Sequence, residues 1–164
     1  MTDQAQMQTL LTITEHREEV ADALYALADA ISRRARIHDR DKLKGKNFRD
    51  YVEVSKIGRT HPFGSEAYAE AMKPHKAEGG VVDRHFKANP HHPEFYDIPK
   101  VQMNFLDIIE MVCDWRAAAR TYGTGRLSES VAYQKQNMDL DACQWWLVDE
   151  VIHWIERSHA LDMP

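Results

Sequence analysis

The segment HFKANPHHPEFY, residues 85–96, holds the densest group of residues that could do chemistry. It places three histidines within eight positions, and its two prolines restrict the backbone. An upstream His38-Asp39 pair and a downstream Asp114 add further nitrogen and oxygen donors. Imidazole and carboxylate groups together suit Mn²⁺, Fe²⁺, Co²⁺, Ni²⁺ or Zn²⁺, and suit Mg²⁺ less well. We therefore predict a catalytic divalent-metal site rather than a closed structural zinc site.

The predicted metal ligands come from separate parts of the chain: His38, Asp39, His85, His91, His92 and Asp114. Adjacent residues in an extended loop point to opposite sides. We therefore expect one of His91 and His92 to bind the ion while the other faces substrate or solvent.

His16 is a further candidate ligand. The 22 residues from His16 to His38 contain no helix breaker. An unbroken helix of this length would separate the two histidines by about 33 Å, which is too far for one ion. Either the helix breaks near Ala30, or His16 is a surface residue or reaches a neighbouring subunit.

Three acidic residues lie together in the segment that follows the histidine loop. Asp107 and Asp114 are seven residues apart, so on a helix they share a face but stand about 10 Å apart along the axis. One ion cannot easily bind both. We prefer Asp114 as the ligand, and expect Asp107 or Glu110 to orient a ligand histidine or to hold a second ion.

Helices must position these residues, because no segment shows the alternation typical of a strand. Helical patterns cover residues 6–37, FRDYVEVSKI, SEAYAEAMK up to Pro74, VVDRHFKA, residue 98 or 99 to 122, residues 128–137, and DLDACQWWLVDEVIHWIERSH. We predict an all-α, single-domain bundle of about six helices. Within residues 1–164 we expect a frayed start (1–11), a metal-site core (12–122) and C-terminal helices (126–159).

The composition fits a folded protein of 164 residues, since 43% of the residues are hydrophobic and the net charge is only −5. A chain of this length can bury about two thirds of its unfolded surface. Acidic residues outnumber basic ones by 26 to 21, which excludes a protein that coats nucleic acid. Any site for phosphate must therefore be local.

Several features favour a cytoplasmic protein with no membrane contact. No stretch approaches the roughly 20 apolar residues that cross a bilayer, and the first 20 residues lack the basic start of a signal peptide. Cys113 and Cys143 lie in apolar helical patterns and not in a CxxC spacing, so we expect buried free thiols.

The HD-domain superfamily of all-helical, metal-dependent phosphohydrolases has a similar order of residues: His16, His38-Asp39, His85, His91-His92 and Asp114. The motifs HDRDKL, NPHHPE and MNFLDIIEMVCDW further resemble those of an uncharacterised family of short phage and bacterial proteins. This similarity covers about residues 12–122. The resemblance to HD-domain enzymes implies an HD-like helical bundle that hydrolyses small nucleotides, nucleoside mono- or triphosphates, through a metal-activated water.

The resemblance also implies roles for individual residues. His38 and Asp39 would form the metal-binding pair, and Asp114 would be the closing aspartate. In HD enzymes the ion lowers the pKa of bound water and polarises a phosphoryl oxygen, while a nearby carboxylate or histidine takes the proton. We assign such catalytic roles to Asp39, Asp107 and Glu110.

A cation near the ion would neutralise substrate phosphate. Lys42, four residues after His38, is the first candidate, followed by Lys73 and Lys87. Among the aromatic residues, Phe95 and Tyr96 on the loop are free to line a substrate pocket.

Two other functions stay open. The same order of histidine and aspartate occurs in HD-type oxygenases with a pair of iron ions. Alternatively, the chain is a non-catalytic interaction protein, whose Trp-rich last helix, QWWLVDEVIHWI, mates with a partner or forms a homo-oligomer.

Overall fold

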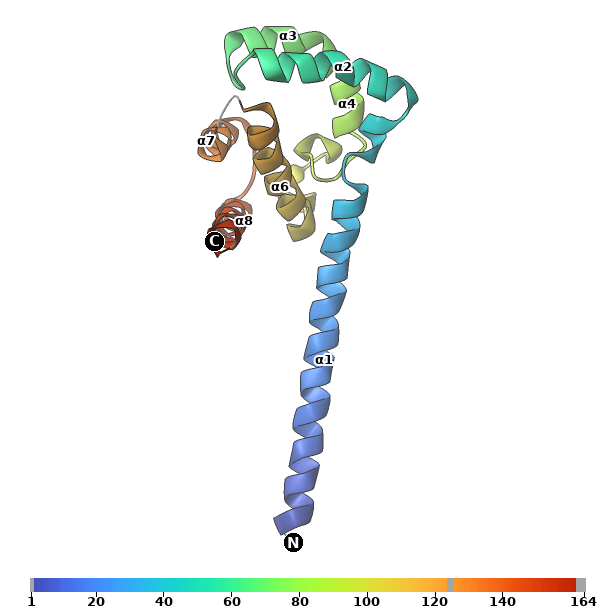
Figure 1. Cartoon of the computed structure of the whole chain (residues 1–164), viewed down its shortest axis with the longest axis vertical. Coiled ribbons are helices and arrows are strands. Elements are labelled where there is room, and N and C mark those ends of the chain that lie inside the picture. The colour runs from blue at the N-terminus through green and yellow to red at the C-terminus, as the bar shows by residue number, and fades with distance from the viewer. Residues whose placement is uncertain (1, 124–125, 162–164) are drawn as a thin grey trace. The chain divides into compact units, whose positions relative to one another are not determined.

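The computed structural model describes residues 2–123 and 126–161, with side chains for residues 3–123 and 126–157. Within these ranges the regular elements are helices and no strand occurs (Figure 1). The prediction of an all-α fold is therefore confirmed, with eight α-helices where about six were expected. The elements are α1 (Thr2–Ile37), η1 (Arg40–Leu43), α2 (Gly45–Thr60), α3 (Glu66–Lys76), α4 (Val81–Phe86), η2 (Pro93–Phe95), α5 (Pro99–Gln102), α6 (Phe105–Tyr122), α7 (Leu127–Asn137) and α8 (Ala142–Leu161), where η marks a 3₁₀ helix.

The chain divides into two compact units, residues 1–38 and 39–164. The first unit consists of α1, which runs for 36 residues without a break and is already helical at Thr2, inside the segment predicted to fray. The described part of α1 contains neither glycine nor proline, which explains its continuity. Its apolar residues recur three or four positions apart, as in Leu24, Leu27 and Ile31, and these side chains are exposed.

The second unit has its main apolar core where α6 packs against α8 (Figure 1). We call this the α6–α8 core; its fully or almost fully buried members include Ile108, Met111, Val112, Val148 and Val151. The predicted last helix has apolar residues on nearly all sides, and α8 accordingly buries one face in this core. Two of its tryptophans, Trp146 and Trp154, remain exposed.

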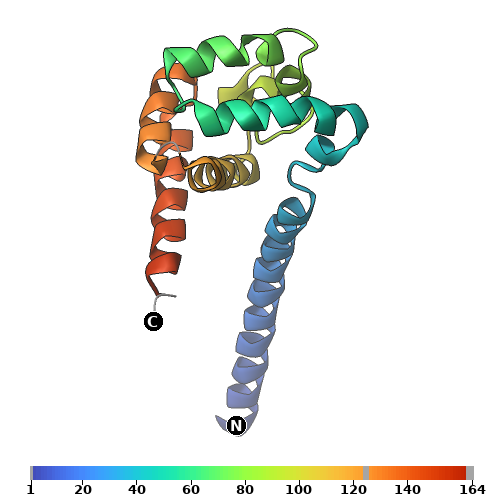
Figure 2. The same ribbon diagram turned by 45° about the horizontal axis from the view of Figure 1, so that its top comes forward.

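A second, smaller core joins α2, α3 and α4, which pack against one another (Figure 2). Met72, Val81 and Val82 are buried there. The helix α3 continues two residues past Pro74, where the sequence predicted its end. A proline in the last turn removes one helical hydrogen bond, which a helix end tolerates better than a helix centre.

The segment predicted as one helix, from residue 98 or 99 to 122, is two helices in the structure. Between α5 and α6, the Asn104 side chain accepts hydrogen bonds from the backbone N–H groups of Leu106 and Asp107. Asp107 in turn accepts one from the backbone of Asn104, which completes a capping box at the start of α6. At its other end, α6 stops at Gly123, whose φ of 65° lies in the left-handed region that glycine adopts readily.

The prediction that the two cysteines are buried is wrong. Cys113 and Cys143 are free thiols with exposed side chains. Cys113 directly follows the fully buried Val112, and one residue turns a helix by about 100°, which carries the thiol out of the core. Of the described helices, none is both long and apolar enough to cross a membrane.

Candidate metal centre

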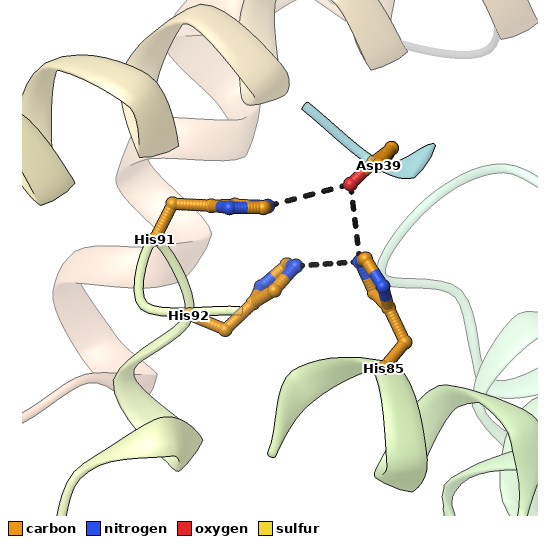
Figure 3. Close-up of side chains that lie close together, drawn as sticks. All are labelled: Asp39, His85, His91 and His92. Carbon is orange, nitrogen blue, oxygen red and sulfur yellow. Dashed lines mark hydrogen bonds and ion pairs between the residues drawn. The ribbon is translucent and has the colours of Figure 1, made fainter. Parts of the chain in front are cut away.

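Three imidazoles and one carboxylate converge in the second unit (Figure 3). Asp39, His85, His91 and His92 each offer one donor atom, and these four atoms lie within 4.8 Å of one another. We call this group the His–Asp cluster. Asp39 directly precedes η1, His85 lies in the last turn of α4, and the other two histidines occupy the loop before η2. The side chains of His85 and His91 are 1% exposed, so this buried group could hold a metal ion.

The distances within the His–Asp cluster suit a common ion. His85 Nε2 lies 3.0 Å from His92 Nε2 and 3.3 Å from Asp39 Oδ1. His91 Nε2 lies 3.6 Å from the same Asp39 oxygen. Ligand atoms about 2.0–2.2 Å from a zinc-like ion, in tetrahedral or octahedral geometry, are about 3–3.5 Å apart. Both the donor types and their spacing therefore fit a first-row divalent ion.

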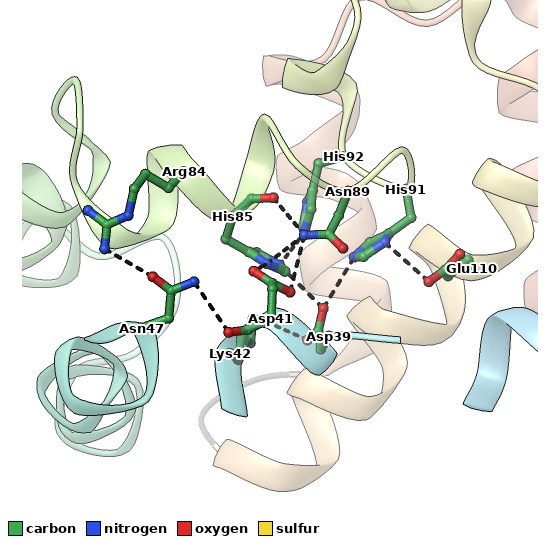
Figure 4. A network of polar contacts seen from close by, with 10 residues as sticks. All are labelled: Asp39, Asp41, Lys42, Asn47, Arg84, His85, Asn89, His91, His92 and Glu110. Carbon is green, nitrogen blue, oxygen red and sulfur yellow. Dashed lines mark hydrogen bonds and ion pairs between the residues drawn. The ribbon is translucent and has the colours of Figure 1, made fainter. Parts of the chain in front are cut away.

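Outer carboxylates orient two of the histidines (Figure 4). His85 Nδ1 lies 2.8 Å from Asp41 Oδ2, and His91 Nδ1 lies 3.2 Å from Glu110 Oε1. When each Nδ1–H donates to its carboxylate, the Nε2 lone pair is directed toward the His–Asp cluster. Asn89 lies beside the His85–Asp41 pair: its Nδ2 donates to Asp41 Oδ1 and to the backbone oxygen of His85, and lies 2.9 Å from His85 Nδ1.

His92 is held in its neutral form. Burial, together with the neighbouring His91, His85 and Lys42, lowers the pKa of His92 to about 2. A neutral imidazole has a free lone pair and binds metal, whereas a protonated one does not. The same surroundings that disfavour the charged ring therefore favour a ligand.

Asp39 takes an unusual backbone conformation. Its φ of 55° lies in the left-handed region, which aspartate tolerates better than most non-glycine residues. Its Oδ2 accepts a hydrogen bond from Lys42 Nζ at 2.5 Å, while Oδ1 faces the histidines. Lys42 also lies 5.2 Å from the centre of the Tyr51 ring. The 3₁₀ helix η1 thus brings one ligand and one cation to the same place.

A cavity of about 360 Å³ adjoins the His–Asp cluster. Lys42, His85, His92 and Asp114 all line it. Asp114 and Asp39 offer carboxylate oxygens within 4.8 Å of each other. Asp114 therefore lies near Asp39 on the cavity wall, and it stays a predicted ligand.

The three acidic residues of α6 have different surroundings. Asp107 is fully buried and accepts hydrogen bonds from the Tyr96 hydroxyl at 2.6 Å and the Asn104 backbone at 2.9 Å. These contacts give Asp107 a capping role. Glu110, one turn later, is the carboxylate beside His91. Of the two predicted alternatives for orienting a ligand histidine, the geometry favours Glu110.

Two predicted ligands lie in the first unit. His38 is its last residue and directly precedes Asp39 in the chain; it stays a predicted ligand. His16 is exposed on α1. Because α1 does not break near Ala30, about 33 Å of helix separates His16 from His38, and the two cannot share an ion within one chain.

Several predicted neighbours of the site lie elsewhere. The residues that line the cavity do not include Phe95 or Tyr96: the former is exposed, and the latter packs against the α6–α8 core. Lys73 and Lys87 have exposed side chains that pair with acidic residues on their own helices or helix ends.

By contrast, both His91 and His92 belong to the His–Asp cluster, where one was expected. The tight turn before η2 lets adjacent imidazoles face the same side, as an extended loop would not.

Two functional residues, Asp41 and Asn89, were not predicted. Asp41 stands two positions after Asp39, in the HDRD sequence, which is the one signal that could have identified it. Asn89 directly precedes Pro90, and no sequence pattern identified it. Both contact His85, which lies 44 residues after Asp41 and four residues before Asn89. Only the folded chain brings the three side chains together.

A family model described as "Family of unknown function (DUF5662)" matches residues 5–160, so the chain belongs to this family. No curated protein and no solved structure matches the chain. The likeness to HD-domain enzymes therefore rests on the sequence motifs and stays a prediction.

Proposed function

We propose that this member of the DUF5662 family is a divalent-metal-dependent phosphohydrolase that acts on small nucleotides. The observation that carries the proposal is that two members of the His–Asp cluster, His85 and His92, line one cavity together with Lys42. A phosphate group bound at that wall would meet the ion and the lysine ammonium together. Three nitrogen donors and one oxygen donor favour Mn²⁺, Fe²⁺, Co²⁺, Ni²⁺ or Zn²⁺ over Mg²⁺.

The protein's own groups would divide the work. Asp39, His85, His91 and His92 would hold the ion, which would supply a water of lowered pKa and polarise a phosphoryl oxygen. Asp114 lines the cavity close to Asp39, and its carboxylate would take a proton from the attacking water.

Charge neutralisation would fall to Lys42. Its ammonium donates to Asp39 Oδ2 and lies on the cavity wall, so a phosphate oxygen could replace or share this partner. Tyr51, beside it, keeps its proton, because burial and the nearby Asp39, Asp41 and Asp114 raise its pKa. A neutral phenol can donate one hydrogen bond to a bound phosphate.

Metal analysis and phosphate release test the proposal together. Protein purified without chelators would be assayed for bound metal by mass spectrometry, and for phosphate release from nucleoside mono- and triphosphates with Mn²⁺, Co²⁺ or Mg²⁺. We expect about one ion per chain and release from at least one nucleotide. His92→Ala should lose both, whereas His153→Ala, at an exposed histidine on α8, should keep both. Stoichiometric metal without phosphate release from any nucleotide would overturn the proposed reaction.

A further inference from the structure

Away from the metal ligands, aromatic and aliphatic side chains share the cavity wall; the aliphatic ones include Val54, Met72, Val82 and Met138. The aromatic ones come from α2, α3, α4, α6, α7 and the turn after α2, and comprise Tyr51, Phe63, Tyr68, Phe86, Trp115, Tyr122 and Tyr133. Phe63 makes edge-to-face contacts with Tyr68 and Tyr133, with ring centres 5.4 and 5.2 Å apart. Such rings offer both faces and edges to a flat guest. The far wall therefore suits a planar aromatic group.

A glycine keeps this wall in place. Gly58 on α2 is buried, and a Cβ atom added there would lie 3.0 Å from two ring atoms of Tyr122. Any larger residue would push the Tyr122 ring, which lines the cavity, from its position. The absence of a side chain at residue 58 thus leaves room for the Tyr122 ring at this part of the wall.

Polar side chains on α7 add hydrogen-bonding groups to the cavity wall. Ser130, Gln134 and Asn137 recur at four and three residues on this helix and all line the cavity. Hydroxyl and amide groups both donate and accept hydrogen bonds. A ring with polar edges, such as a nucleobase, would satisfy them better than a hydrocarbon ring.

The charges around the cavity limit the number of phosphates. Among the described residues, those lining it include two lysines, Lys42 and Lys76, and no arginine. The carboxylates of Asp114 and Glu94 line it too, and Lys42 is already paired with Asp39. A triphosphate carries about two more negative charges than a monophosphate at neutral pH and needs more cations to balance them. The lining therefore favours one phosphate group, neutralised by the ion and Lys42.

We propose that the cavity selects nucleoside monophosphates, with the base against Tyr68, Tyr122 and Tyr133 and the phosphate toward Lys42 and the His–Asp cluster. Hydrolysis of the phosphate ester rests on the proposed function, whereas recognition of the base does not. The Tyr residues and Gly58 are specificity-determining residues, and the metal ligands take no part in reading the base.

Calorimetric titration of the Mn²⁺-loaded protein would test this inference. The ligands are the four common ribonucleoside monophosphates, their triphosphates, their nucleosides and methyl phosphate. We expect at least one monophosphate to bind about tenfold or more tightly than both its triphosphate and methyl phosphate. Its nucleoside should bind measurably without metal. Tighter binding of the triphosphate, or equal binding of methyl phosphate, would overturn the inference.

Variants separate the cavity from the ion. Tyr122→Ala removes one stacking surface and should weaken binding of the preferred monophosphate about tenfold, while Mn²⁺ binding stays unchanged. Gly58→Ala, which displaces the same ring, should act in the same direction. Tyr25→Ala, at an exposed tyrosine of α1, is the matched control and should bind as wild type. Unchanged affinity in a folded Tyr122→Ala protein would contradict the assignment.

The two proposals fail in distinguishable ways. Tight monophosphate and nucleoside binding without phosphate release would end the hydrolase proposal and leave the cavity assignment intact. Phosphate release that is faster from methyl phosphate or triphosphates than from monophosphates would do the reverse. Tryptophan emission gives an independent readout, because Trp115 lines the cavity while Trp146 and Trp154 are exposed elsewhere.

Discussion

The second unit contains two buried regions, and α6 contributes to both. One region is apolar, and the other consists of imidazole and carboxylate groups. Toward α8, the helix presents Ile108, Met111 and Val112 to the α6–α8 core, each at most 1% exposed. Glu110 and Asp114, on the same helix, meet His91 and the cavity. Apolar burial stabilises the fold, whereas burial of carboxylates and imidazoles costs free energy unless they are paired.

This difference indicates which region stabilises the fold and which one could bind an ion. Substitutions in the α6–α8 core should lower the free energy of unfolding and leave the affinity for metal intact. Substitutions in the His–Asp cluster should weaken metal binding and lower the free energy of unfolding less. The following changes test this separation, starting with the largest expected effect.

Met111→Ala should lower the free energy of unfolding by about 2–5 kcal/mol, because it removes a fully buried side chain and leaves a cavity. Urea denaturation measures this loss. Met7→Ala, at an exposed methionine of α1, is the control and should change it by less than about 0.5 kcal/mol. If the folded Met111→Ala protein also lost its metal affinity, the two regions would not be separate.

His92→Ala should weaken metal binding by about 100-fold or more, equivalent to about 2.7 kcal/mol, because one of four donors disappears. Competition with a chromophoric chelator measures the affinity. The metal-free variant should lose less unfolding free energy than Met111→Ala. Metal affinity equal to that of the wild type would remove His92 from the ligand set.

Glu110→Gln should weaken metal binding by about 10–100-fold, since the amide no longer accepts strongly from His91 Nδ1 and the ring loses its fixed orientation. The same chelator competition applies. Glu129→Gln, at an exposed glutamate of α7, serves as the matched control. An unchanged affinity in Glu110→Gln would mean that the carboxylate does not position the histidine.

Asp107→Asn should have the smallest effect, a loss of about 1 kcal/mol of unfolding free energy through the weakened capping box at the start of α6. Its metal affinity should match the wild type. Asp107 and Glu110 are three residues apart on one helix, so this pair of variants sharpens the comparison. Loss of metal affinity in Asp107→Asn would instead support its predicted catalytic role.

Much of the local structure could be predicted from residue patterns. Long runs with helical periodicity identified α1, most of α6 and α8, because helical hydrogen bonds join residues close in sequence. The break before α6 was missed, since Asn104 caps a helix only if the chain turns there. The prediction that α3 ends at Pro74 was wrong, since the last turn of a helix tolerates a proline.

By itself, the sequence determined that the fold is helical and that histidine and carboxylate donors are available for an ion. Only the tertiary structure decided that Asp39 meets His85, that Asp41 rather than a residue of α6 orients this ring, and that Tyr122 and Tyr133 face a common cavity. The physical reason is the range of the interactions. Helix propensity and capping act within a few residues, whereas these contacts join segments tens of residues apart, whose meeting depends on the packing of the whole unit.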